Sequence, residues 1–598
     1  MRQERKEVPV EQTWNLEDLF ESPENWENEL QSILQDVDKI VAYKGKLGES
    51  SATLLAALKE LETFEERLIQ VGTYAFLRIS VDGANPETQA GAAKNAAAMA
   101  TINAKLSFFE SELLTVPAST IEQYIEKEKE LLPYKKKLSD ILEKKPYTLH
   151  PETEETLAAL GEVHEAPFMI YERSKASDME FDSITDNQGN VLPMSEALYE
   201  DRYEISADTT LRRNAYDSYV STLNKYKNTF AATYATEVTK QVKMAEIRGF
   251  DSVIDMLLHP QQVTKVMYEN QLKVIQKELA PHMHKYAQLL KKDYGLDRVR
   301  FADLKAPLDP EFNPETTYEE AKEMILEALK VLGPEYNEAM RGAFENRWID
   351  YADNVGKQSG AFCASPYGAH PYILLTWTDK MRGAFTLAHE LGHAGHFYLA
   401  NKYQNLVNTD PSTYFVEAPS TMNELLLAEY LMQKTEDKRM KRWVINQLLG
   451  TYYHNFITHL LEAEFQNRVY SLAESGVPLT ADVLCDQKQA TIKSFWGDAA
   501  DIDEGAGLLW MRQPHYYMGL YPYTYSAGLT VSTIVSQKIK AEGQPIVERW
   551  LEVLKAGGTL RPLDLIKEAG VDMSRPDSIK EAVAYVGSLI DELEKSYE

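Results

Sequence analysis

The sequence is organised around one stretch, Ala384-Phe385-Thr386-Leu387-Ala388-His389-Glu390-Leu391-Gly392-His393. A helix turns by about 100° per residue, so His389 and His393 project from one face and can hold one metal ion. Glu390 follows His389 directly and is placed to reach a water on that metal, which is the position that a general base needs. The stretch therefore predicts a helix that carries a hydrolytic zinc site.

Two histidines one turn apart can also be ordinary polar members of an amphipathic helix. Here the flanking residues are apolar almost all round: Ala384, Phe385, Leu387, Ala388 and Leu391. Such apolar flanking residues predict a buried helix. Burying His389, Glu390 and His393 without a partner would cost free energy. A metal ion supplies that partner, so we favour the metal site.

Composition narrows the classes of protein that need to be considered. The chain has 598 residues, enough for several domains or for one continuous helical body, and its formal charge is 63 − 92 = −29. This charge opposes binding to nucleic acid or to an anionic membrane surface. The amino terminus has no apolar signal region, and no apolar window of about 18 residues is present. We expect a soluble, cytoplasmic protein.

The sequence has only two cysteines, Cys363 and Cys485. They cannot form a disulfide framework or a cysteine-rich zinc site, although a single bridge between them stays open. Their small number suits a reducing compartment. We expect both to be buried as small hydrophobic side chains.

Helical periodicity dominates the chain and predicts a mainly α fold. The predicted helices cover residues 54–79, 89–115, 121–145, 263–294 and 317–332, together with a long helix that Asp208 caps and that ends near Gly249. Residues 179–193 instead alternate with period two around a turn, which predicts a β-hairpin. We therefore divide the chain into an amino-terminal helical region, 1–205, and a catalytic region, 206–598.

A second β element is expected beside the metal helix. The small residues of Ser359–Pro371, which include Gly360 and Gly368, lead into the β-prone run Tyr372–Trp377. A peptide could pair its backbone with such a strand if it lay at a sheet edge, so Gly360, Gly368 and Tyr372 are candidates for substrate binding. An ordinary buried strand fits the residues equally well.

A catalytic zinc usually takes three protein ligands, and the third must come from elsewhere. The metzincin signature requires glycine at position 396 and histidine at position 399, where this chain has His396 and Leu399. Carboxylates on a following helix offer another route, because Glu417 and Glu424 lie seven positions apart and can share a face. His396 also shares the face of His389, but three ligands within two turns of one helix would crowd the ion.

At this point the sequence resembles the thimet oligopeptidase-like metallopeptidases, and within them the oligoendopeptidase F branch. The resemblance is carried by His-Glu-Leu-Gly-His at 389–393, by Phe-Val-Glu-Ala-Pro-Ser-x-Met-x-Glu at 415–424, by the opening Trp14–Leu19, and by the aromatic segments 513–517 and 521–525. It implies a mostly helical ellipsoid with a deep channel for short peptides. It also implies that Glu424 is the third ligand and Glu390 the base.

The resemblance further implies that a histidine and tyrosines near the carboxy terminus face the zinc. His515, Tyr525 and Tyr523 are the candidates, because phenol groups are suitable donors to a developing oxyanion. Glu417 and His396 are then left as neighbours of the ligands or as alternative ligands.

Together these observations predict a zinc-dependent endopeptidase that hydrolyses oligopeptides and holds one Zn²⁺ per chain. Two alternatives stay open. A non-catalytic helical scaffold or peptide-binding protein would bind no zinc, and a zinc hydrolase of a non-peptide amide would share the ligands but differ in substrate.

Overall fold

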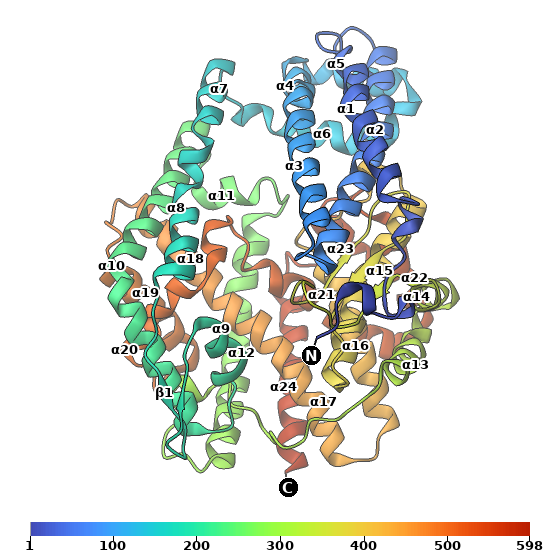
Figure 1. Ribbon diagram of the computed structural model, residues 1–598. Coiled ribbons are helices and arrows are strands. Elements are labelled where there is room, and N and C mark those ends of the chain that lie inside the picture. Colours follow the sequence, from blue (N-terminus) through green and yellow to red (C-terminus); the bar gives the residue numbers. More distant parts are fainter. Residues whose placement is uncertain (1, 598) are drawn as a thin grey trace.

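The computed structural model describes residues 2–597 and is mainly helical, which confirms the predicted fold class (Figure 1). The helices of the first half are α1 Pro23–Val41, α2 Ser51–Val81, α3 Pro86–Leu106, α4 Phe108–Thr115, α5 Ala118–Lys127, α6 Lys135–Glu143, α7 Pro151–Ala159, α8 Gly161–Arg173, α9 Glu196–Leu198, α10 Thr209–Arg248, α11 Val253–Leu258 and α12 Lys265–Asp293.

Those of the second half are α13 Tyr318–Leu329, α14 Pro334–Glu345, α15 Met381–Tyr403, α16 Glu417–Lys434, α17 Lys438–Tyr452, α18 His459–Glu474, α19 Ala481–Trp496, α20 Glu504–Gly507, α21 Thr524–Glu542, α22 Gln544–Ala556, α23 Pro562–Glu568 and α24 Pro576–Ser596. A π-helical turn, η11, joins α17 to α18 over Tyr453–Thr458, and a 3₁₀ turn, η14, covers Pro514–Tyr517.

Capping residues in the sequence determine where many of these helices begin and end. Asp208 Oδ1 accepts hydrogen bonds from the backbone N–H groups of Thr210 and Leu211, and Gly249 ends α10 with φ +79°, as predicted. The predicted helix over residues 121–145 is wrong in one respect, because it is split into α5 and α6. A 3₁₀ turn with Pro133 inside it separates the two helices. Proline lacks the N–H that a continuous helix would need there.

Two large hydrophobic cores organise the helices. The first joins buried residues of α1–α6, from Trp26 to Ile141, and these helices lie at the upper right of Figure 1. The second runs from Tyr171 to Leu593 and contains α10, α12 and α15–α18. A small cluster in which Trp14 and Leu77 meet Tyr372 lies between them. The division at residues 205 and 206 stays a proposal.

Strands are few. β1 Ile184–Thr185 and β2 Val191–Leu192 form an antiparallel pair. A three-stranded sheet has the order β3 Ile349–Asp350, β5 Tyr372–Leu374, β4 Phe362–Ala364, and β4 contacts α15. β5 pairs parallel with β3 and antiparallel with β4, so it is the central strand, and β3 and β4 are the two edge strands.

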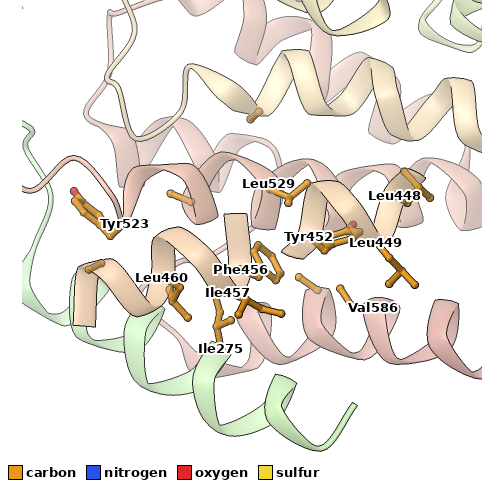
Figure 2. Close-up of a cluster of buried hydrophobic side chains, with 14 of the residues drawn as sticks. Ile275, Leu448, Leu449, Tyr452, Phe456, Ile457, Leu460, Tyr523, Leu529 and Val586 are labelled. Atoms are coloured by element: carbon orange, nitrogen blue, oxygen red, sulfur yellow. The ribbon is translucent and has the colours of Figure 1, made fainter. Parts of the chain in front are cut away.

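The layer around the metal helix is continuous: α15 packs on α16, and α16 packs on α21. Beside it, α17, η11 and α18 rest on α21, α12 and α24 through a buried hydrophobic cluster that includes Tyr452, Phe456, Ile457 and Leu460 (Figure 2). This packing fixes the buried side of η11 and leaves its other side free to form a cavity wall.

Candidate active site

Two glycines allow the helices of the site to approach closely. A Cβ on Gly392 of α15 would lie 2.5 Å from Ser420 Cα of α16, and a Cβ on Gly528 of α21 would lie 2.8 Å from the backbone nitrogen of Ala418. Only glycine fits at such crossings. The first turn of α16, which begins at Glu417, is therefore held between α15 and α21.

This crossing brings Glu417 to the two motif histidines. Glu417 Oε2 lies 3.4 Å from His389 Nε2 and 3.4 Å from His393 Nε2. A tetrahedral zinc with bonds of about 2.0–2.1 Å has donor atoms about 3.4 Å apart, so the three groups fit this metal. One donor atom from each residue lies within 4.8 Å of the others.

The prediction that Glu424 is the third ligand does not match this arrangement. Glu424 Oε1 lies 2.7 Å from Nδ1 of His389, the ring nitrogen that does not face Glu417, and Thr451 donates a hydrogen bond to Glu424 Oε2. Glu424 lies two turns further along α16 than Glu417, about 10 Å along the helix axis. A carboxylate on Nδ1 fixes the tautomer that leaves Nε2 free for a metal.

Charges in the cluster are strongly coupled. Burial alone would lower the pKa of His389, but hydrogen bonds with Glu417 and Glu424 raise it well above its ordinary value. Burial would raise the pKa of Glu417, but His389 and His393 hold it well below its usual range. A metal ion bound to these atoms would have to replace the hydrogen bonds between Glu417 and the two histidines.

Glu390 lies on the same helix and is 6% exposed. Burial raises its pKa above the ordinary value, and the adjacent histidines partly offset this effect. A carboxylate with a raised pKa next to a metal site can accept and release a proton near neutral pH. The general base role that the motif predicts for Glu390 stays a prediction.

His396 does not join the cluster. Its side chain is fully buried beside Phe397 and Phe415, and neither ring nitrogen has a hydrogen-bond partner among the described residues. Burial and the neighbouring His393 lower its pKa to about 3, so the ring is neutral. The structure therefore places His396 in the core behind the site.

The carboxy-terminal aromatic segment divides into two groups. The rings of His515, Tyr521 and Tyr525 lie 5.3–5.8 Å from one another, and Tyr525 lines the same cavity as His389 and Glu417. Tyr523 points away: it is fully buried, donates a hydrogen bond to Gln261 and packs on Tyr268. The prediction that Tyr523 donates a hydrogen bond to the oxyanion is therefore wrong. Because α21 begins at Thr524, residues two positions apart, such as Tyr523 and Tyr525, do not project in the same direction.

The three predicted substrate residues differ in their surroundings. Tyr372 is fully buried in the central strand β5, so of the two alternatives that the sequence left open the structure has the ordinary buried strand. Gly368, with φ +79°, packs against α2, where a Cβ would come within 2.6 Å of Gln70 Nε2. Gly360, with φ +88°, has open space around its Cα. The edge strands are β3 and β4, the two neighbours of β5.

A cavity of about 810 Å³ opens beside the cluster. It is lined by His389, Glu417, Thr421 and Glu424 of the site helices and by Trp443, Tyr453, His454, Thr458 and Tyr525 of α17, η11 and α21. His454 and its buried neighbours His459 and Glu462 were missed in the sequence, because their spacing matches no simple ligand or catalytic pattern. The cavity is large enough for several residues of an extended peptide.

Comparisons with known proteins identify the family of this chain. Residues 203–585 match the model of peptidase family M3, and residues 112–181 match that of oligopeptidase F. The chain is 34% identical to oligopeptidase PepF of Bacillus subtilis, over 99% of this chain and 88% of the relative. The chain therefore belongs to peptidase family M3, a family of metallopeptidases.

Within that family it is a homologue of oligopeptidase F over its full length. A crystal structure of a peptidase from Chlamydophila abortus superposes with a TM-score of 0.91 at 26% identity, covering 100% of both chains. Oligoendopeptidase F from Enterococcus faecium gives a TM-score of 0.74 at 25% identity, covering 96% of this chain and 99% of that one. The family resemblance drawn from the motifs is thereby confirmed.

Proposed function

We propose that this protein is an endopeptidase for oligopeptides that holds one zinc ion per chain between His389, His393 and Glu417. The observation that carries the proposal is the pair of 3.4 Å distances from Glu417 Oε2 to the two Nε2 atoms, at the wall of a cavity of about 810 Å³. Glu424 then acts on His389 Nδ1 as the residue that orients the ligand. This assignment replaces Glu424 by Glu417 as the third ligand.

Zinc bound at these residues would supply a Lewis acid that polarises the peptide carbonyl and acidifies a water molecule. Glu390 accepts the proton that this water loses on attack and transfers it to the amide nitrogen of the leaving peptide. Tyr525, which lines the cavity, is the candidate to donate a hydrogen bond to the carbonyl oxygen as it becomes negative, and His515, whose ring lies 5.8 Å from that of Tyr525, is a second candidate.

Oligopeptides are the substrate class for three reasons. The relatives are named as oligopeptidases, the cavity accommodates only a short segment, and β4 is an edge strand of the kind that pairs with an extended backbone. Cys363 and Cys485 are both free and half-buried, and we assign the protein to the cytoplasm. No helix within residues 2–597 combines the length and apolar composition needed to cross a membrane.

The test combines metal analysis with peptide digestion. Purified protein should contain one zinc per chain and should cleave a mixed pool of oligopeptides, and a chelator should stop the cleavage. Glu390→Gln should keep the zinc and lose most of kcat, whereas Glu126→Gln, an exposed control, should change neither. A protein without bound zinc, or Glu390→Gln with wild-type turnover, would contradict the proposal. A protein that contains zinc but cleaves only non-peptide amides would show that the substrate class is different.

A further inference from the structure

A chain of three polar side chains, two of them buried, leads from the core to the wall of the cavity. Glu462 Oε2 lies 2.7 Å from His459 Nδ1, and His459 Nε2 lies 3.0 Å from His454 Nε2. Glu462 and His459 are each 3% exposed, whereas His454 is exposed and lines the same cavity as His389 and Glu417. The chain therefore connects an interior carboxylate with a ring that a bound peptide can touch.

The fold holds this chain rigidly. η11, which carries His454, is a π-helical turn whose buried side is fixed by Phe456 and Ile457 (Figure 2). The Tyr525 ring stacks on His459 with a centroid distance of 4.0 Å and an interplanar angle of 13°. π-helical turns occur often at functional sites, where the extra residue redirects a side chain.

His459, Glu462 and His515 also lie close enough together to suggest a second metal site. The hydrogen bonds favour a different interpretation, because both nitrogens of His459 already have partners: Nδ1 has Glu462, and Nε2 has His454. Neither nitrogen keeps a lone pair for an ion unless one of these contacts breaks. We therefore treat the cluster as a hydrogen-bond chain.

The chain fixes where the protons lie. The buried Glu462 carboxylate accepts from His459 Nδ1, and in the neutral His459 ring Nε2 then carries a lone pair. That lone pair accepts the N–H of His454 Nε2. The second nitrogen of His454, Nδ1, is then a bare acceptor, and it has no hydrogen-bond partner among the described residues. Because His454 lines the cavity, its Nδ1 can accept a hydrogen bond from a donor group of the substrate.

We propose that His454 binds substrate: its Nδ1 accepts a hydrogen bond from a backbone N–H of the bound peptide. This inference rests on the proposed function, since it names one contact within that substrate site. His459 and Glu462 are positioning residues, which set the tautomer of His454 and touch no substrate. A contact with backbone rather than side chain suits a peptidase that accepts varied sequences.

The first experiment uses the full-length zinc-loaded protein and one oligopeptide that it cleaves. At each position other than the scissile bond, the backbone N–H is replaced in turn by an ester oxygen, and KM and kcat are measured for wild type and His454→Phe. At one position the ester should raise the wild-type KM about 3- to 10-fold with kcat nearly unchanged. In His454→Phe the KM for the parent peptide should be raised similarly, and that ester should change it less than about twofold.

Equal ester effects in wild type and His454→Phe would overturn the inference and leave the proposed function standing. A wild-type protein that cleaves no peptide would overturn both. A second readout does not depend on turnover: spectra of ¹⁵N-labelled histidine, with His454→Phe used for assignment, should show His454 protonated at Nε2 and bare at Nδ1. A proton on Nδ1 would also overturn the inference.

Discussion

Gly392 of α15 and Ser420 of α16 mark the point where the two site helices meet: a Cβ on Gly392 would lie 2.5 Å from Ser420 Cα. The helix crossing thus requires a glycine at this position of the His-Glu-Leu-Gly-His motif, for a structural reason that is independent of metal binding. It permits the crossing that sets Glu417 beside His389 and His393.

We therefore expect Gly392→Ala to separate α15 from α16, to lower the free energy of unfolding by about 1–3 kcal/mol and to weaken zinc binding. Thermal unfolding and zinc analysis would measure both effects. Gly72→Ala in α2 is a matched control, because a Cβ there meets nothing within 4 Å and alanine favours a helix. A Gly392→Ala variant that behaves like Gly72→Ala would disprove the role of the crossing.

Variants of the two glutamates of α16 should differ in their affinity for zinc. Glu424→Ala removes the partner of His389 Nδ1 and should weaken zinc affinity about 10- to 100-fold. Glu417→Ala removes a ligand and should weaken it further, whereas His396→Ala, in the core behind the site, should leave one zinc per chain. Competition with a chelator of known affinity would rank the three variants. The reverse order for the two glutamates would restore Glu424 as the ligand.

The two tyrosines at the start of α21 should also behave differently. Tyr525→Phe removes a donor from the cavity wall and should lower kcat about 100-fold or more while zinc stays bound. Tyr523→Phe loses only its buried hydrogen bond to Gln261 and should cost about 1 kcal/mol of stability with kcat little changed. Steady-state kinetics together with urea unfolding of both variants separates these outcomes, and equal losses of kcat would contradict the assignment.

Stability should depend on pH through Glu204, which is buried between Arg512 and Lys305 at 2.9 and 3.0 Å. Burial would raise its pKa, but the two cations lower it from 4.5 to about 2. Because the folded pKa is the lower one, the stabilisation is complete above pH 4.5 and is lost as pH falls toward 2. The difference between the pKa values of Glu204 in the unfolded and folded states corresponds to roughly 3 kcal/mol of stability.

Glu204→Gln should therefore unfold at lower urea than wild type at pH 7, and the difference should shrink as the pH falls below about 4.5. Glu126→Gln, on the exposed face of α5, serves as the control and should follow wild type throughout. A difference between wild type and Glu204→Gln that grows toward acid pH would show that the sign is wrong.

The sequence by itself determined the features that depend on near neighbours. The four-residue step from His389 to His393 set one helical face, Asp208 and Gly249 set the ends of α10, and hydrophobic spacing set the mainly helical class. These features follow from helix periodicity and capping, which act within one or two turns.

Only the tertiary structure decided which of two equivalent residues faces the site. Glu417 and Glu424 share one helix, and Tyr523 and Tyr525 share one segment, so periodicity could not separate them. The choice depends on where α15, α16 and α21 cross, and this is set by contacts such as Gly392 with Ser420 and Gly528 with Ala418. Those contacts join residues far apart in the chain, and the shapes that must fit together there leave no periodic trace in the sequence.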